Sequence, residues 1–204
     1  MFYKVFRFIC KALFILFFWS IKTEGEESIN NGGPIILAAN HVSYIDPIAL
    51  GVAIKRPIRF IGKQEVFENP FLGFFARALG AIPVDRKKVN FTSIKKSISL
   101  LKNNHIIGIF PEGTRSLDGK LQELNSGMLK IALKTSSPIV PVGINGTFDI
   151  YPPKAKMPKF FKRKTIYLHF GRPIYLDYNK GKDIQYQKES LLNIQKKIKE
   201  LTNN

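Results

Sequence analysis

Short apolar runs alternate with helical patterns along most of this chain, and no other feature constrains its fold as strongly. Each run is four to six residues long and is bounded by turn residues. The runs are residues 35–39, 58–61, 81–84, 106–110 and 139–144, and the helical patterns between them are residues 47–54, 70–79, 91–101 and 127–134. Strands that alternate with helices at this spacing indicate an α/β fold, with a mainly parallel sheet flanked by helices. At 204 residues the chain has room for one such domain.

Two further segments extend this domain toward the C-terminus. Residues 165–170 alternate apolar and polar side chains, which is typical of a strand. Residues 183–201 place apolar side chains at spacings of three, four and seven, so these side chains share one face of a helix that packs on the domain. Neither segment carries residues to which we assign chemistry.

The chain is strongly basic, with 32 Lys and Arg residues against 15 Asp and Glu residues and a formal net charge of +17. Such an excess indicates an anionic partner, either nucleic acid or acidic lipid. The single cysteine, Cys10, excludes a disulfide framework within the chain, and the presence of only three histidines argues against a multi-histidine metal site. We therefore expect no bound metal.

The first 21 residues combine many apolar side chains with three cations. The uncharged run between Lys11 and Lys22 is ten residues long, and as a helix it would cover about half of a ~30 Å hydrocarbon core. A secretory signal peptide and a core-packing helix are the alternatives. We expect a helix that lies in one leaflet, with Trp19 at the headgroup level. The predicted division is a membrane-associated helical segment over residues 1–30 and the α/β domain over residues 31–204.

A second basic cluster spans residues 152–164 and contains six cations and three prolines. The prolines exclude a regular helix, so this segment is predicted to be a loop. A loop of this kind can be merely solvated. Phe160 and Phe161 lie inside the cluster, and they favour a second contact with a membrane that carries anionic lipid.

The loop that follows the first predicted strand carries His41 and Asp46. In a parallel sheet, ligands bind beyond the carboxyl ends of the strands, so chemistry is expected in such loops. These residues suit a general base and a carboxylate that fixes its tautomer. Asp46 before Pro47 is also typical of a helix N-cap, and Ser43-x-x-Asp46 fits a capping box. The sequence alone leaves these roles open.

The loop after residues 106–110 contains an acid, a glycine and an arginine in close succession, at Glu112, Gly113 and Arg115. A flexible backbone and a forked guanidinium suit an anion such as a phosphate monoester. A tight turn that leads into the next helix is the alternative. Lys63 and Arg86 follow two other predicted strands, so they are expected at the same edge of the sheet.

Four segments carry a recognisable pattern of residues. They are Asn40-His41-x4-Asp46, Gly80-Ala81-Ile82-Pro83-Val84-Asp85-Arg86, Phe110-Pro111-Glu112-Gly113-Thr114-Arg115-Ser116 and Ile139-Val140-Pro141-Val142. In order and approximate spacing they resemble the four sequence blocks of the glycerophospholipid acyltransferases, and most of all the bacterial 1-acylglycerol-3-phosphate acyltransferases. The resemblance runs from residue 33 to residue 144, over more than half of the chain.

The resemblance implies transfer of a fatty acyl group from a thioester to the free hydroxyl of 1-acyl-glycerol-3-phosphate, which yields phosphatidic acid. It implies His41 as the general base and Asp46 as its partner. It assigns Arg115 to the acceptor's phosphate, and Pro141 of the fourth block to a structural or acyl-side role. The full acceptor-binding set that it implies is Lys63, Arg86, Glu112, Gly113, Thr114 and Arg115.

The expected partners follow from the same resemblance. They are a lysophospholipid acceptor and a thioester of acyl carrier protein or coenzyme A, and no separate cofactor is expected. The N-terminal segment predicts a monotopic enzyme, which we expect on the cytoplasmic face of the cell membrane. Glycerol 3-phosphate or a lyso-aminolipid is the alternative acceptor. A basic nucleic-acid-binding module is the alternative of a different class, but the chain has no recognition-helix, zinc-finger or RNP pattern. We therefore expect no nucleic-acid partner.

Overall fold

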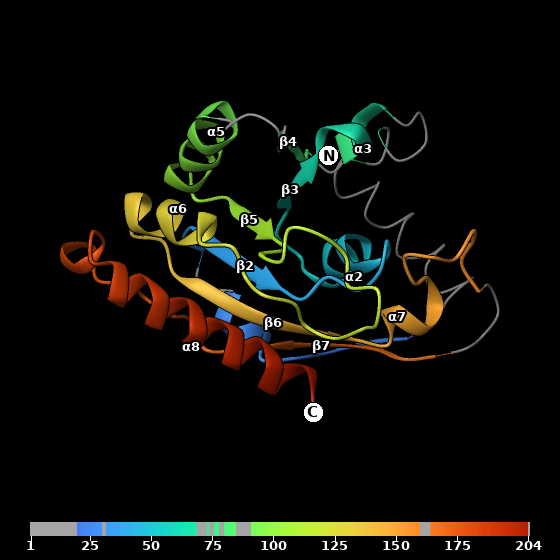
Figure 1. Ribbon diagram of the computed structural model, residues 1–204. Coiled ribbons are helices and arrows are strands. Elements are labelled where there is room, and N and C mark those ends of the chain that lie inside the picture. The colour runs from blue at the N-terminus through green and yellow to red at the C-terminus, as the bar shows by residue number, and fades with distance from the viewer. Residues whose placement is uncertain are drawn as a thin grey trace.

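Seven strands form one sheet in the computed structural model of this chain (Figure 1). The structure describes residues 20–29, 32–68, 73, 76–77, 80–84, 91–159 and 164–203. The strands are β1 (Ile21–Glu24), β2 (Ile35–Ala39), β3 (Ile58–Lys63), β4 (Ile82–Val84), β5 (Ile106–Ile109), β6 (Ile139–Asn145) and β7 (Ile166–Phe170). Their order is β1-β7-β6-β2-β5-β3-β4, and neighbours are parallel except β6 and β7. The predicted α/β fold with a mainly parallel sheet is confirmed.

Helices cover both faces of this sheet. The helices are α2 (Asp46–Ala53), α3 (Gln64–Glu68), α5 (Phe91–Lys102), α6 (Gly127–Thr135), α7 (Thr147–Ile150) and α8 (Ile184–Thr202), with the 3-10 turns η1 (Glu26–Ile29) and η2 (Tyr178–Lys180). Helices α5, α6 and α8 pack on one face and α2 packs on the other (Figure 1). The long helix α8 runs across β6, which it contacts more than any other strand.

Alternate residues of the central strand β2 contribute to two separate apolar cores. Ile35 and Leu37 pack in the cluster that includes α2, whereas Ile36 and Ala38 pack in the cluster of α5, α6 and α8. All residues of β2 are buried, as expected of a parallel strand that is covered on both faces. Each large buried side chain stabilises the fold by ~1.5–3 kcal/mol. The rigid sheet gives the loops at its edge a fixed base.

The domain begins earlier than the sequence predicts. Residues 21–29 are predicted to belong to the N-terminal helical segment, but β1 pairs in parallel with β7 over its four residues. Ile29, at the end of η1, is buried in the core cluster that includes α2. The structure thus differs from the predicted division at residues 21–29, which pack as part of the sheet domain. Residues 1–19, where the membrane-associated helix is predicted, lie outside the described residues.

Most predicted elements after residue 30 are found where they are expected. The helices predicted over residues 47–54, 91–101, 127–134 and 183–201 correspond to α2, α5, α6 and α8, within one residue at each end. The strand predicted over residues 165–170 is β7, and it runs antiparallel to β6. The helix predicted over residues 70–79 and the pair Phe160 and Phe161 fall largely or wholly outside the described residues.

The carboxyl ends of β2, β5 and β6 meet at one edge of the sheet, because the three strands are parallel neighbours. The loops that follow β2 and β5 cross this edge (Figure 1). None of the helices in the described ranges is both long enough and apolar enough to cross a membrane.

Candidate active site

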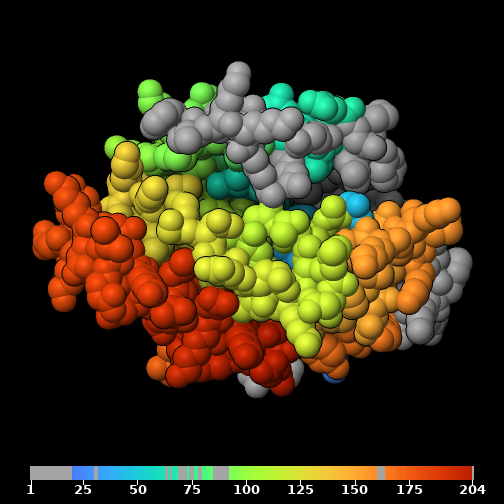
Figure 2. Space-filling model, in the orientation of Figure 1, coloured from blue at the N-terminus to red at the C-terminus, as the bar shows by residue number. Residues whose placement is uncertain are grey.

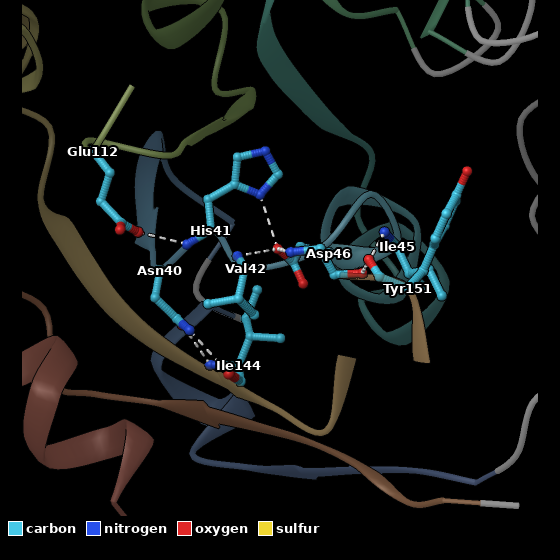
Figure 3. Close-up of polar contacts among 9 residues, drawn as sticks. Asn40, His41, Val42, Ile45, Asp46, Glu112, Ile144 and Tyr151 are labelled. Carbon is cyan, nitrogen blue, oxygen red and sulfur yellow. Dashed lines mark hydrogen bonds and ion pairs between the residues drawn. The ribbon is translucent and has the colours of Figure 1, made fainter. Parts of the chain in front are cut away.

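The loop after β2 brings His41 against Asp46, the first residue of α2 (Figure 3). His41 Nδ1 lies 2.8 Å from Asp46 Oδ2. The carboxylate is fully buried, whereas the imidazole keeps 18% of its surface exposed. Because Asp46 engages Nδ1, the opposite ring nitrogen, Nε2, is the one through which His41 can exchange a proton.

Asp46 does not cap helix α2. The N-cap position is Ile45, whose side chain makes no capping hydrogen bond. Asp46 Oδ2 instead accepts hydrogen bonds from the backbone N–H groups of Val42 and Ser43, each at 2.8 Å. Of the predicted capping box, only the bond from Ser43 N–H to Asp46 forms, because the N–H of Asp46 donates to the backbone carbonyl of Ser43 rather than to its hydroxyl. The carboxylate is therefore fixed toward the loop and His41.

The backbone of His41 is held by the loop that follows β5. Its N–H donates to Glu112 Oε1 at 2.6 Å, and its carbonyl accepts from the N–H of Ser116 at 2.8 Å. The preceding residue, Asn40, exchanges two hydrogen bonds with the backbone of Ile144 in β6, at 3.0 and 2.7 Å (Figure 3). His41 is thus tied to residues at the ends of β2, β5 and β6.

Aromatic stacking fixes the plane of the His41 ring. The ring lies on Phe110, with centroids 4.0 Å apart and planes inclined by 19°. Phe110 in turn lies nearly parallel to Phe60, at 5.9 Å. One face of the imidazole therefore rests on an apolar surface, while its edge is bonded to Asp46.

Glu112 is the second buried carboxyl group of this region, with 6% of its surface exposed. Its second oxygen accepts from the N–H of Gln122 at 2.8 Å. Burial raises the pKa of Glu112 from 4.5 to about 7; its two backbone hydrogen bonds act in the opposite direction, and the nearby Asp46 adds to the rise. Both carboxyl oxygens bind backbone, so Glu112 joins the loops rather than facing open solvent.

Residues 113–115 lie between the two points at which this loop binds His41. Gly113 has a φ of +73°, in the left-handed region that glycine favours, and its N–H closes a turn on the Phe110 carbonyl. Thr114 is exposed. The Cζ atom of Arg115 lies 3.5 Å from the centre of the Tyr44 ring, and the Nη1 atom of Arg115 is buried with no hydrogen-bond partner among the described residues. An anionic oxygen would satisfy this donor.

A cavity of about 560 Å³ opens beside the same loop. Phe110 and Glu112, which contact His41, form part of its wall. The remaining lining is mostly apolar, and its largest side chains come from β3, β5, α5 and α6, including Ile61, Ile94, Ile109, Met128 and Ile131. Its size and lining suit an apolar ligand.

Within the described ranges, no group of three His, Cys, Asp or Glu side chains is arranged to hold a metal ion.

Comparison with known proteins relates this arrangement to one family. A sequence model of the family named Acyltransferase matches residues 20–145. The chain belongs to the acyltransferase family. It is 33% identical over 156 residues to the 1-acyl-sn-glycerol-3-phosphate acyltransferase of Bacillus subtilis, and the match covers 76% of this chain and 74% of that relative.

Two further acyltransferases extend the comparison. The chloroplast enzyme LPAT1 of Arabidopsis thaliana is 32% identical over 155 residues, which are 73% of this chain and 43% of the longer relative. The crystal structure of the 1-acyl-sn-glycerophosphate (LPA) acyltransferase PlsC from Thermotoga maritima matches with a TM-score of 0.79 at 28% identity. That match covers 98% of this chain and 78% of PlsC. The chain therefore matches acyltransferases in its fold as well as in its sequence.

Of the other predicted site residues, the structure describes Pro141 fully, Lys63 only in its backbone, and Arg86 not at all. Lys63 ends β3, but its side chain is not among those described, and Arg86 lies outside the described residues. Pro141 is buried in β6 opposite Ala38, and its carbonyl accepts from the N–H of Gly171 at 2.8 Å. This position within the sheet favours the structural role of Pro141 over an acyl-side role.

Several residues that shape the acyltransferase site are absent from the predicted set. Asn40 and Phe110 lie within the sequence blocks, next to predicted site residues, and this position could have identified them as part of the site. Tyr44 lies between His41 and Asp46, but nothing in the sequence shows that its ring meets Arg115. Gln122 contributes only its backbone N–H to Glu112, so its residue type carries no signal at all.

Proposed function

We propose that the protein transfers a fatty acyl group from an acyl thioester to the free hydroxyl of 1-acyl-glycerol-3-phosphate, which yields phosphatidic acid. One observation carries the proposal: the loop with the His41–Asp46 pair is hydrogen-bonded to the loop of Arg115, whose buried Nη1 has no partner within the part of the chain that the structure describes. Acylation of an alcohol that bears a phosphate needs a base and an anion site side by side. The names of the relatives from Bacillus subtilis and Thermotoga maritima support the same acceptor.

His41 is the general base in this proposal. Its Nε2 takes the proton of the acceptor hydroxyl while the hydroxyl oxygen forms a bond to the carbonyl carbon of the thioester. The tetrahedral intermediate then collapses and the carbon–sulfur bond breaks. The imidazolium returns the proton to the leaving sulfur, so the products are an ester and a free thiol.

Asp46 keeps the proton on Nδ1 of His41 and stabilises the imidazolium that forms during transfer. The two backbone N–H groups that also bind Oδ2 hold this carboxylate in place before the substrate arrives. The stacking of His41 on Phe110 limits the remaining rotation of the ring. The base is thus oriented in advance, which lowers the cost of reaching the transition state.

Arg115 is assigned to the phosphate of the acceptor. A phosphate monoester presents oxygens that a guanidinium binds through two parallel hydrogen bonds. Gly113 and Thr114 adjoin this position, and Lys63 and Arg86 are proposed as further cationic contacts from the family resemblance. Glu112 supports the site by holding the loop against His41.

The apolar cavity beside Phe110 is proposed to hold a fatty acyl chain. A pocket of about 560 Å³ is in the range that proteins use for ligands of this class. The donor is a thioester of acyl carrier protein or coenzyme A, and its activated carbonyl makes a separate cofactor unnecessary for the proposed transfer.

The basic sequence supports association with a membrane that carries anionic lipid. We propose a monotopic enzyme on the cytoplasmic face, held by its N-terminal segment. Within the described residues, the segment after α7 carries two exposed residues that could contact such a membrane, Lys156 and Met157. Met157 is 65% exposed. Because α7 directly follows β6, this segment lies at the same edge of the sheet as His41, at one end of the face seen in Figure 2.

The test is an acyl-transfer assay of the purified full-length protein with a labelled acyl thioester. The acceptors are 1-acyl-glycerol-3-phosphate, glycerol 3-phosphate, a lyso-aminolipid and the lysolipid whose phosphate is esterified to choline. The proposal predicts labelled phosphatidic acid as the main product, and His41→Ala is the matched inactive control. Faster acylation of glycerol 3-phosphate or of the lyso-aminolipid would overturn the choice of acceptor.

A further inference from the structure

The ring of Tyr44 supports the guanidinium of Arg115. The 3.5 Å between Arg115 Cζ and the ring centroid is well within the ~6 Å range of a cation–π contact. A guanidinium that stacks by its face keeps the N–H donors at its edge available for a planar array of oxygens. The buried Nη1 has no hydrogen-bond partner among the residues that the structure describes, so its hydrogen-bonding capacity is not used by them.

Tyr44 is itself held by its neighbours. Its ring lies 4.9 Å from the ring of Tyr151, with the planes inclined by 35°. On one side of Tyr44 in the chain, Ser43 donates its hydroxyl to the Tyr151 carbonyl at 2.8 Å. On the other side, the N–H of Ile45 donates to the same hydroxyl oxygen at 3.2 Å. The tyrosine ring is therefore a fixed surface rather than a loose loop side chain.

The backbone around Arg115 is also fixed. Glu112 and Ser116, on either side of Arg115, bind the N–H and the carbonyl of His41. What remains to be set is the direction of the long arginine side chain, and the Tyr44 ring sets the plane of its end group. Because Tyr44 and His41 belong to one short loop, the same contact fixes the guanidinium relative to the base.

We propose that Tyr44 is a positioning residue, whose ring holds the Arg115 guanidinium so that the phosphate of the acceptor binds at a fixed place relative to His41. The inference rests on the proposed function and adds a specificity-determining contact to it. The aromatic ring is required, whereas the hydroxyl of Tyr44 is not. Loss of the ring should weaken binding of the phosphate by about 2- to 30-fold, the range of one cation–π contact.

The experiment compares Tyr44→Phe, which keeps the ring, with Tyr44→Leu, which removes it. Steady-state kinetics should show an increase of about 2- to 30-fold in KM for 1-acyl-glycerol-3-phosphate in Tyr44→Leu. The KM for the acyl thioester should stay within about twofold of wild type, and Tyr44→Phe should retain wild-type constants. Tyr44→Met, with an unbranched side chain, replaces the leucine variant if that variant does not fold.

Tyr167→Leu is the matched control. Tyr167 in β7 also lies under a cation, with Lys22 Nζ 5.9 Å from its ring centroid, but β6 and β2 separate its strand from β5. Its replacement should leave all constants unchanged. In an Arg115→Ala background, Tyr44→Leu should have no further effect on kcat/KM, because the proposed contact is already lost. Equal effects in both backgrounds, or an equal loss in Tyr44→Phe, would overturn the proposal.

Calorimetric titration with glycerol 3-phosphate separates this inference from the proposed function. This soluble phosphate monoester should bind wild type and Tyr44→Phe alike, and Tyr44→Leu about 2- to 30-fold more weakly. If the wild type fails to acylate 1-acyl-glycerol-3-phosphate but this order of binding holds, the choice of reaction is wrong and the role of Tyr44 stands. Equal binding to all three proteins would overturn the role of Tyr44 whatever the reaction.

Discussion

Glu112 should make the folded protein less stable as the pH rises toward neutrality. Burial places the pKa of this carboxyl group at about 7 in the folded chain, against an ordinary value of 4.5. Between these values the folded chain binds more protons than the unfolded chain, so the free energy of unfolding falls as the pH rises. At about 1.36 kcal/mol per pKa unit, the folded protein loses about 3 kcal/mol of stability, and this loss is complete above the folded pKa.

Glu112→Gln is the variant that isolates this effect. The amide has the shape of the carboxyl group but does not titrate. Its oxygen can accept from only one of the two backbone N–H groups, those of His41 and Gln122, and its NH2 group must face the other. That unmatched donor costs about 1–3 kcal/mol at every pH, so it shifts the stability of the variant without changing its pH dependence.

Denaturant titrations of the wild type and of Glu112→Gln measure both free energies of unfolding across the pH range. The stability of the wild type minus that of the variant should fall by about 3 kcal/mol between about pH 4 and about pH 8.5, with most of the fall below about pH 7. Other titrating groups cancel in this difference. Parallel curves for the two proteins would refute the reasoning, because they would mean that the pKa of Glu112 is the same in both states.

Three further changes test other parts of the site. Asp46→Asn should lower kcat by about 10²- to 10⁴-fold in a thiol-release assay, because the amide no longer fixes the proton on Nδ1 of His41. Arg115→Lys should raise the KM for the acceptor, but not for the thioester, because an ammonium cannot replace the fork. Deleting residues 1–19, which leaves β1 in place, should release the protein from vesicles with anionic lipid in a flotation assay.

Each of these changes also has an outcome that would count against it. Wild-type turnover by Asp46→Asn would leave the carboxylate with a structural role only. Equal changes in both KM values for Arg115→Lys would point to a general distortion of the loop rather than to a lost phosphate contact. Complete release of the full-length protein by salt alone would indicate that the N-terminal segment is not inserted among the lipid chains.

The parallel sheet and the position of its functional edge could be predicted from the sequence because burial on both faces makes a strand continuously apolar. β2 and β5 stand out for this reason, and their shared direction brings His41 and Glu112 to one edge. Strand β1 could not be found in the same way. It is four residues long and half-buried, and it directly follows a strongly apolar segment that masks its alternation.

The contacts inside the site were less predictable than the residues themselves. The spacing of His41 and Asp46 was compatible with a general base and its carboxylate partner, or with a helix cap. Which of the two forms depends on the conformation of the loop, and local propensity does not encode that conformation. Tyr44 lies in the loop after β2 and Arg115 in the loop after β5, so their contact depends on the pairing of the two strands in the folded sheet. The contacts of Glu112 were equally hard to predict. Its residue type suggests contact with a ligand, whereas in the structure it is buried and its carboxylate binds the backbone of the His41 loop.

The turnover of His41→Ala tests the central claim most directly. The variant removes the imidazole but leaves the backbone bonds of His41 to Glu112 and Ser116 available, so the loops should keep their places. With 1-acyl-glycerol-3-phosphate and an acyl thioester at saturation, kcat should fall by about 10²- to 10⁴-fold, while the circular dichroism spectrum and the denaturation midpoint stay near those of wild type. Near-wild-type kcat in the folded variant would contradict the assignment of His41 as the general base.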